Sequence, residues 1–374
     1  MATDPDWEGL DTASSDGGWG DYPLDAVFVR TETRTVTEVV KRIEGGRYVL
    51  DPDFQRDFVW PVPKQSKLIE SCVMRIPLPV FYVAEAKDGK IIVVDGLQRL
   101  TTFARFLGNK LRLSGLSTGA GVGGAHLLGS KRFNDLPLNL QERVQDTQLT
   151  LYILDAKAPE RARLDIFERV NSGEPLTRQQ MRNALYNGPA TQWLKRAASS
   201  DEFRSATGQT LNDKTMRDRE AINRFCAFKL LGYKAYTSGD MDDFLGRGLT
   251  KLAALGDTDR QKLQQSFTDS MRLNRKLFKM HAFRKSLASA TPSASRSVIN
   301  IALFEVCSVL LSDEAVLGAE TAHGAVKAAI IELLHNESFS KAITYSTNST
   351  VAVKTRFERM RKALDGALNE DLSA

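Results

Sequence analysis

The sequence predicts an α+β protein in which a small mixed α/β core is followed by a mainly helical C-terminal region. Short runs rich in Val and Ile alternate with helical periodicity in the first part of the chain, whereas from Arg161 onward apolar residues recur almost only at helical spacing. The chain has 374 residues, of which 42% are hydrophobic, so it is long enough for two domains. We expect a disordered acidic tail over residues 1–29, the mixed core over 30–190 and a helical bundle region over 191–374.

The elements of the core follow from local patterns. Valines at helical spacing predict a helix that starts near Val36 and stops at Gly45-Gly46. Prolines at 52, 61 and 63 predict irregular backbone before the next helix. Asp88-Gly89 predicts a hairpin between two strands. In order, we expect an extended run over 47–50, a helix over about 64–74, strands over 80–84 and 91–94, a helix over 97–107, a glycine-rich loop over 114–130 and a strand over 150–154.

Charge is distributed unevenly along the chain. The expected tail carries seven acids and no Lys or Arg, so the remainder has 51 Lys and Arg against 39 Asp and Glu, a formal charge of +12. A basic body with an acidic tail is compatible with binding a polyanion, because Lys and Arg that neutralise phosphates release counterions. Solubility alone is the alternative explanation.

Composition also excludes several classes of site. The three cysteines form no C-x-x-C pair, so buried thiols are expected rather than disulfides or a zinc site. The four histidines match no metal-binding pattern, which argues against a histidine-containing metal nuclease in this chain. We expect a cytoplasmic protein with no membrane association, because the sequence has neither a run of about 18 to 20 apolar residues nor a signal peptide.

The most informative motif is the segment from Ile91 to Arg99, in which a buried strand leads through a glycine turn into a helix. The first N–H groups of a helix lack internal partners and carry the positive end of its dipole, so a phosphate can bind there. Gly96 lets a ligand approach the backbone closely, Arg99 offers a planar guanidinium to phosphate oxygens, and Gln98 can orient a nucleotide or a water. Asp95 is the candidate for Mg²⁺ coordination or for activating that water. The alternative is that Asp95 only caps the helix and that Arg99 is surface charge.

Two further segments carry candidate residues. Gln55 and Arg56 lie close to Trp60, which together suggest a bound phosphate and a stacked base, although a Trp is more often a core residue. Asn171 lies at a predicted helix end, where a C-cap is the alternative explanation. The glycine-rich loop contains chance matches to dinucleotide and Walker-type patterns, in the second of which Ser and Lys stand in the wrong order.

The order of these motifs closely resembles the family named after the N-terminal domain of GmrSD-type restriction endonucleases, over roughly residues 31–370. The resemblance implies a core of the ParB and sulfiredoxin type that binds and hydrolyses a nucleoside triphosphate with Mg²⁺, in a prokaryotic system of anti-phage defence or DNA restriction. The motifs that carry it are Phe54-Gln55-Arg56 with Trp60, Ile76-Pro77-Leu78-Pro79, Asp95-Gly96-Leu97-Gln98-Arg99-Leu100-Thr101-Thr102, Phe133-Asn134-Asp135-Leu136-Pro137, Phe167 to Thr177, and Arg217-Asp218-Arg219-Glu220 with Arg224-Phe225.

Carried over by position, the resemblance implies Asp95, Gln98 and Arg99 as catalytic residues and Asp95 as the metal ligand. The residues that it implies for nucleotide binding are Gln55, Arg56, Gly96, Thr101 and Asn171. One departure is Leu97, where the commonest family turn has Gln, so hydrolysis is less strongly implied than nucleotide binding. A second departure is that no His-Asn-His nuclease domain is evident, so DNA cleavage would require a partner protein.

The expected function is therefore that of a nucleotide-dependent sensor or switch with an NTPase activity, with DNA or a DNA-processing protein as partner. A homo-oligomer is also compatible with the sequence. Three alternatives stay open: a ParB-like DNA-binding module without turnover, a Mg²⁺-dependent DNA nickase, and a toxin-like or antitoxin-like interaction protein.

Overall fold

The computed structural model describes residues 7–8, 29–50, 60–86, 88–116, 127–158, 160–170, 177–208, 210, 215–289 and 295–372. The chain divides into two units, residues 20–185 and residues 1–19 with 186–374. A mixed five-stranded sheet and many helices confirm the predicted α+β class.

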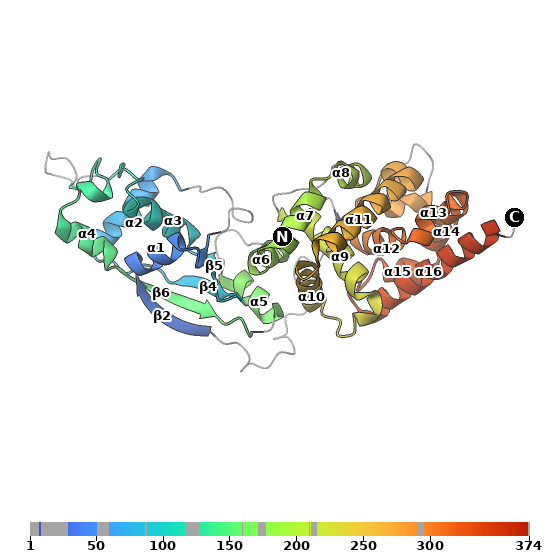
Figure 1. The fold of residues 1–374 in the computed structure, drawn as a ribbon, viewed down its shortest axis with the longest axis horizontal. Helices are drawn as coiled ribbons and strands as arrows, with labels where there is room; N and C mark the ends of the chain where they lie inside the picture. The colour runs from blue at the N-terminus through green and yellow to red at the C-terminus, as the bar shows by residue number, and fades with distance from the viewer. Residues whose placement is uncertain are drawn as a thin grey trace. The chain divides into compact units, whose positions relative to one another are not determined.

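A sheet with the strand order β2-β6-β4-β5-β3 forms the centre of residues 20–185 (Figure 1). The pairs β2/β6 and β4/β5 are antiparallel, whereas β6/β4 and β5/β3 are parallel. The strands are β2 (Val29–Thr35), β3 (Tyr48–Val49), β4 (Phe81–Glu85), β5 (Ile91–Asp95) and β6 (Gln148–Leu154). The predicted hairpin between β4 and β5 is confirmed by their antiparallel pairing.

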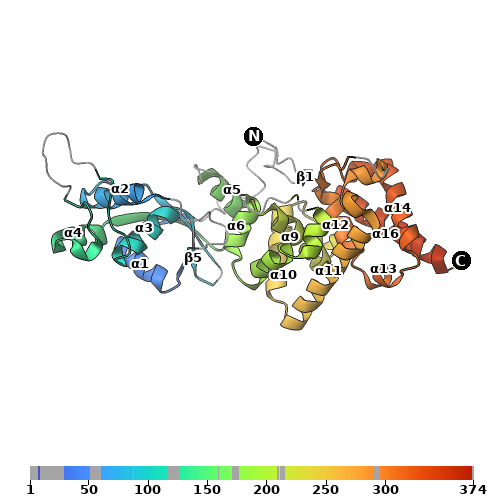
Figure 2. The same ribbon diagram turned by 90° about the horizontal axis from the view of Figure 1, so that it is seen from above.

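Alternation along the strands explains why one face of this sheet is covered by helices. In β6, Leu149, Leu151 and Ile153 are buried in the hydrophobic core, while the side chains between them are partly exposed. In Figure 1 and Figure 2 the first four helices gather on that face. These helices are α1 (Val36–Glu44), α2 (Val62–Val73), α3 (Leu97–Leu107) and α4 (Leu138–Gln145).

Two more helices and a short 3-10 helix complete residues 20–185: α5 (Glu160–Val170), α6 (Arg178–Leu185) and η2 (Phe133–Asp135). Arg163 of α5 donates to the carbonyl oxygen of Glu85 over 2.9 Å, which fixes α5 beside the end of β4. Asp165 and Arg178 form an ion pair of 2.8 Å that joins α5 to α6.

Residues 186–374 are helical, as expected from their periodicity. Helix α12 packs against α9, α11 and α16, and all ten of its residues are buried. Two residues near the N-terminus, β1 (Trp7–Glu8), pair in parallel with β7 (Ile299–Asn300). The helices are α7 (Pro189–Ala198), α8 (Asp201–Thr207), α9 (Arg217–Leu231), α10 (Met241–Ala253), α11 (Asp257–Phe278), α12 (Ile301–Leu310), α13 (Glu314–Gly318), α14 (His323–His335), α15 (Glu337–Ala342) and α16 (Thr350–Leu372), with 3-10 helices η4 (Tyr233–Ala235), η5 (Lys279–His281) and η6 (Lys285–Ser289).

A buried carboxylate on α12 joins three helices of this unit. Glu305 Oε1 accepts from Arg224 Nη1 of α9 over 2.6 Å, and Glu305 Oε2 accepts from Arg356 Nη2 of α16. Arg224 also donates to Asn348 Oδ1 over 3.1 Å, and Arg356 donates to the carbonyl oxygen of Thr347. Because Glu305 and Arg356 are fully buried and Arg224 nearly so, the carboxylate is needed to compensate two desolvated cations.

The three cysteines are buried and free, as predicted. Burial raises the pKa of the Cys72 thiol to about 11, which keeps it protonated at neutral pH. Within the part of the chain that the structure describes, no helix combines the length and apolar character needed to cross a bilayer.

Replacing Glu305 with Gln is expected to lower the free energy of unfolding by about 3 kcal/mol or more, because it leaves two buried guanidinium groups without their carboxylate. Urea unfolding followed by circular dichroism measures the change. Glu337→Gln is the matched control, since its ion pair with Lys341 is exposed and should contribute less than about 1 kcal/mol. Equal losses in the two variants would contradict the role given to Glu305.

Candidate functional site

The predicted strand, turn and helix are confirmed at the end of β5. The strand ends at Asp95, Gly96 has a φ of 103°, and α3 begins at Leu97. A Cβ on Gly96 would lie 2.3 Å from Cδ1 of Phe81. Both the left-handed backbone and the close contact with an aromatic ring therefore require glycine at this position.

Arg99 of α3 holds the turn against the start of the neighbouring strand. Since β4 runs antiparallel to β5, Tyr82 lies opposite Asp95, and the residues that precede β4 lie beside the turn. Arg99 Nη1 donates to the carbonyl oxygen of Pro79, and Arg99 Nη2 donates to the carbonyl oxygen of Val80 over 3.1 Å. One guanidinium thus joins the first turn of α3 to the backbone that leads into β4.

Two further contacts complete the environment of the Arg99 guanidinium. Its Nη2 donates to Asp95 Oδ2 over 2.8 Å, and its central carbon lies 4.1 Å from the centre of the Phe81 ring. The Arg99 side chain is only 11% exposed, so the alternative that it is surface charge is wrong. Burial lowers the pKa of Arg99, and the charge of Asp95 opposes that effect.

Asp95 does not cap α3. The N-cap residue is Gly96, and no side chain accepts a hydrogen bond from the first turn of the helix. The Asp95 side chain is 41% exposed, and its Oδ1 makes no hydrogen bond to the described residues. One carboxylate oxygen is therefore held by Arg99 while the other is open to a ligand.

Gln98 connects α3 to the chain that enters α2. Its Oε1 accepts from the backbone N–H of Trp60 over 3.3 Å, and its carbonyl oxygen accepts from Thr102 Oγ1 over 2.7 Å. Trp60 is partly buried and packs against the core, and Lys64 Nζ lies 4.4 Å from the centre of its ring. Lys64 was missed by sequence reasoning, because helical periodicity does not indicate that a first-turn lysine folds back over an aromatic ring.

The other predicted residues differ in what the structure says of them. Thr101 lies in α3, and its side chain is partly buried. Gln55, Arg56 and Asn171 lie outside the described residues. The described ends of the segment that holds Gln55 and Arg56 are both close to the site, because Val49 pairs with Ile92 of β5 and Trp60 contacts Gln98.

The first turn of α3 can accept an anion. Helix N-termini present N–H groups that lack internal acceptors, and here no capping side chain serves them. The positive end of the helix dipole and the close backbone approach at Gly96 favour negative charge at this point. Among the described residues, no group of three or more metal-binding side chains was found, so a metal ion at Asp95 would depend on ligand oxygens and water.

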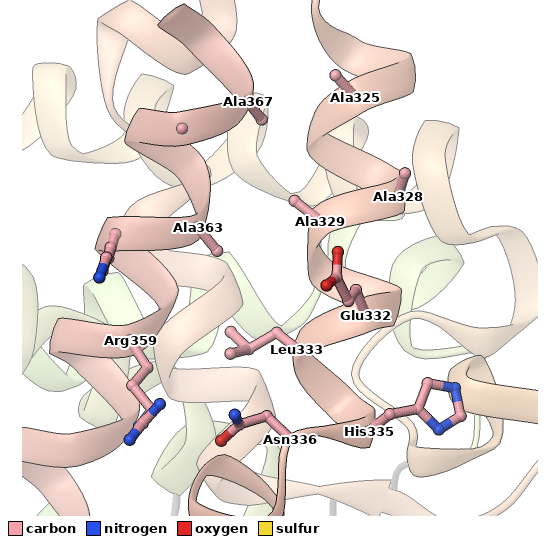
Figure 3. A pocket seen from close by; sticks show the side chains of 12 residues that line it. Ala325, Ala328, Ala329, Glu332, Leu333, His335, Asn336, Arg359, Ala363 and Ala367 are labelled. Carbon is pink, nitrogen blue, oxygen red and sulfur yellow. The ribbon is translucent and has the colours of Figure 1, made fainter. Parts of the chain in front are cut away.

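A groove of about 720 Å³ lies elsewhere, between α14 and α16 (Figure 3). Small side chains including Ala329 and Ala363 line it, and Arg359 and Glu332 stand on its two sides. None of the predicted site residues lines this groove.

The class defined by fold and site is an α+β domain with an uncapped strand, turn and helix next to an acidic side chain. The family model described as GmrSD restriction endonuclease, N-terminal domain, matches residues 36–187, and this segment belongs to that family. The resemblance predicted from the motifs is confirmed there, over a shorter span than the motifs suggested. No curated protein and no solved structure matches the chain.

Gly96→Ala is expected to lower the free energy of unfolding by about 2–4 kcal/mol, because the added methyl group adopts a left-handed backbone and overlaps Phe81. Thermal and urea unfolding measure the loss. Gly89→Ala is the control for backbone strain alone, since Gly89 has a φ of 77° with nothing within 4 Å of the added Cβ. The packing contribution is refuted if both variants lose the same stability, which for Gly89→Ala should be about 1 kcal/mol.

Proposed function

We propose that residues 36–187 bind a nucleoside triphosphate at the Asp95 turn and that the protein is a nucleotide-dependent sensor or switch of a restriction or anti-phage defence system. The family of this segment implies the restriction context. The observation that carries the nucleotide assignment is the uncapped first turn of α3, which follows Gly96 and lies beside the open oxygen of Asp95.

In this proposal the backbone of the α3 first turn binds a phosphate group. N–H groups at a helix N-terminus are directed along the helix axis and need no rearrangement to accept an oxyanion. Gly96 lets the ligand approach this backbone because it has no side chain. The ammonium group of Lys64 and the indole of Trp60, which lie together at the edge of the site, supply a cation and an aromatic surface for the rest of the nucleotide.

We assign Arg99 a positioning role instead of direct phosphate binding. Its guanidinium already donates to two backbone oxygens and a carboxylate and stacks on Phe81. These contacts fix the first turn of α3 relative to β4 and hold one oxygen of Asp95. The residue that sequence reasoning placed on the phosphate therefore acts through the residues that it orients.

Asp95 is the residue that we propose for the chemistry. Its open oxygen can accept a proton from a water or bind Mg²⁺ that bridges phosphate oxygens, because Mg²⁺ is commonly held by one or two carboxylates together with substrate phosphates. Gln98 can orient the water, since its amide is fixed at one end by Trp60. Leu97 is half-buried and packs against the core, so it supplies no polar group at this step.

Phosphate release from ATP, GTP, CTP and UTP with Mg²⁺, with and without DNA, tests this function. We expect turnover with at least one nucleotide and a loss of about 100-fold or more in Asp95→Asn, the usual effect of removing a general base. Asp88→Asn, which alters an exposed carboxylate of the β4/β5 hairpin, should keep full activity. Unfolding midpoints of both variants control for folding.

The same assay separates the alternatives. Absence of turnover together with strongly salt-dependent DNA binding would favour a ParB-like binding module. Plasmid nicking that a chelator abolishes would favour a nuclease. Turnover that is equal in wild type and Asp95→Asn would refute the assignment of Asp95.

Arg99→Lys tests the positioning role. An ammonium group cannot replace the forked donors that reach Pro79, Val80 and Asp95, so we expect the free energy of unfolding to fall by about 2 kcal/mol. Urea unfolding measures the change, with Arg42→Lys as control because the ion pair of Arg42 with Glu38 is exposed. A residue that contacted only the phosphate would show unchanged stability in Arg99→Lys together with lost nucleotide binding.

A further inference from the structure

A buried arginine without a carboxylate partner lies in the helical unit, between η5 and η6. Arg284 is 2% exposed, and its guanidinium donates to the carbonyl oxygens of Ala282 and Thr207 over 3.0 and 2.8 Å. Its Nε is buried and has no hydrogen-bond partner. Among the described residues no acid pairs with Arg284, which distinguishes it from Arg356, whose charge Glu305 compensates.

The charged neighbour of Arg284 is a second arginine. A Cβ on Gly208 would lie 2.7 Å from Arg296 Nη1 and 3.7 Å from Arg284 Nη2, so both guanidinium groups border the same point at the end of α8. Arg296 is exposed and makes no hydrogen bond or ion pair with the described residues. Burial lowers the pKa of Arg284 to about 10, and the like charge of Arg296 adds to this effect.

The nearby acid does not neutralise this pair. Glu8 of β1 forms an ion pair with Lys285, the residue that follows Arg284. The two arginines therefore leave an uncompensated positive charge of about two units at one place, one group exposed and one buried behind it. Desolvated cations without a counter-charge are unfavourable, and they are retained in proteins mainly where an anion compensates them.

We propose that Arg284 and Arg296 form a site for a phosphate group on the helical unit. Arg296 contacts the phosphate oxygens directly, because a guanidinium offers two parallel N–H donors to an oxyanion. Arg284 stabilises the bound anion from behind, through a charge that solvent screens little. The site belongs to a different unit from the Asp95 turn and does not depend on the function proposed for it. The phosphate can be that of a free nucleotide or of a nucleic-acid backbone.

The experiment compares full-length wild type, Arg296→Glu and the control Arg359→Glu, which reverses an exposed arginine on α16 with no ion pair to the described residues. Thermal unfolding is measured in inorganic phosphate, in ATP and in chloride at equal ionic strength, and binding of a fluorescent single-stranded oligonucleotide is measured by anisotropy. We expect phosphate to raise the Tm of wild type and Arg359→Glu by several degrees beyond any shift in Arg296→Glu. In chloride, Arg296→Glu should have a higher Tm than wild type, because the new carboxylate compensates Arg284.

The arms also identify the source of the phosphate. A nucleic-acid ligand predicts about tenfold weaker oligonucleotide binding by Arg296→Glu and a slope of log K against log salt that is smaller by about 0.9 for a lost contact. A free nucleotide predicts an Arg296-dependent Tm shift with ATP and none in oligonucleotide binding. The proposal is overturned if no phosphate compound has an effect that depends on Arg296, or if Arg296→Glu lowers the Tm in chloride.

Discussion

The candidate site depends on the four contacts of one guanidinium group. Arg99 donates to the backbone before β4 and to Asp95, and it lies on the ring of Phe81. Gly96 is possible at the turn only because Phe81 fills the space that a side chain would take. The position of α3, the orientation of Asp95 and the absence of a capping side chain are therefore parts of one arrangement around Arg99.

The fold was predictable where a local pattern determines an element. Asp88-Gly89 gave the hairpin, and Gly96 with the apolar spacing of the following residues gave α3 with the bounds that the structure shows. Strand β2 was not predicted, because its sequence, VRTETRT, is polar and lacks alternation. It is an edge strand held by pairing with β6 and by ion pairs such as that of Arg30 with Glu85, which join residues far apart in the chain.

For the candidate site, the sequence indicated the residue types but not their partners. The pattern from Asp95 to Arg99 predicted a turn suited to phosphate, and the turn is present. The contacts of Arg99 with Pro79 and Val80 arise from the antiparallel pairing of β4 and β5, which no spacing rule expresses at the level of side chains. The same holds for Gln98, whose partner Trp60 lies 38 residues earlier.

The ion pair between Asp95 and Arg99 has a consequence for selectivity. A divalent cation alone must compete with the guanidinium for the carboxylate, and an inorganic anion alone meets that carboxylate as a like charge. A metal-chelated polyphosphate presents both signs together, so it can satisfy Asp95 with its metal and α3 with its oxygens while Arg99 keeps its backbone acceptors. The pair thus acts as an electrostatic filter that favours the chelate over either of its components.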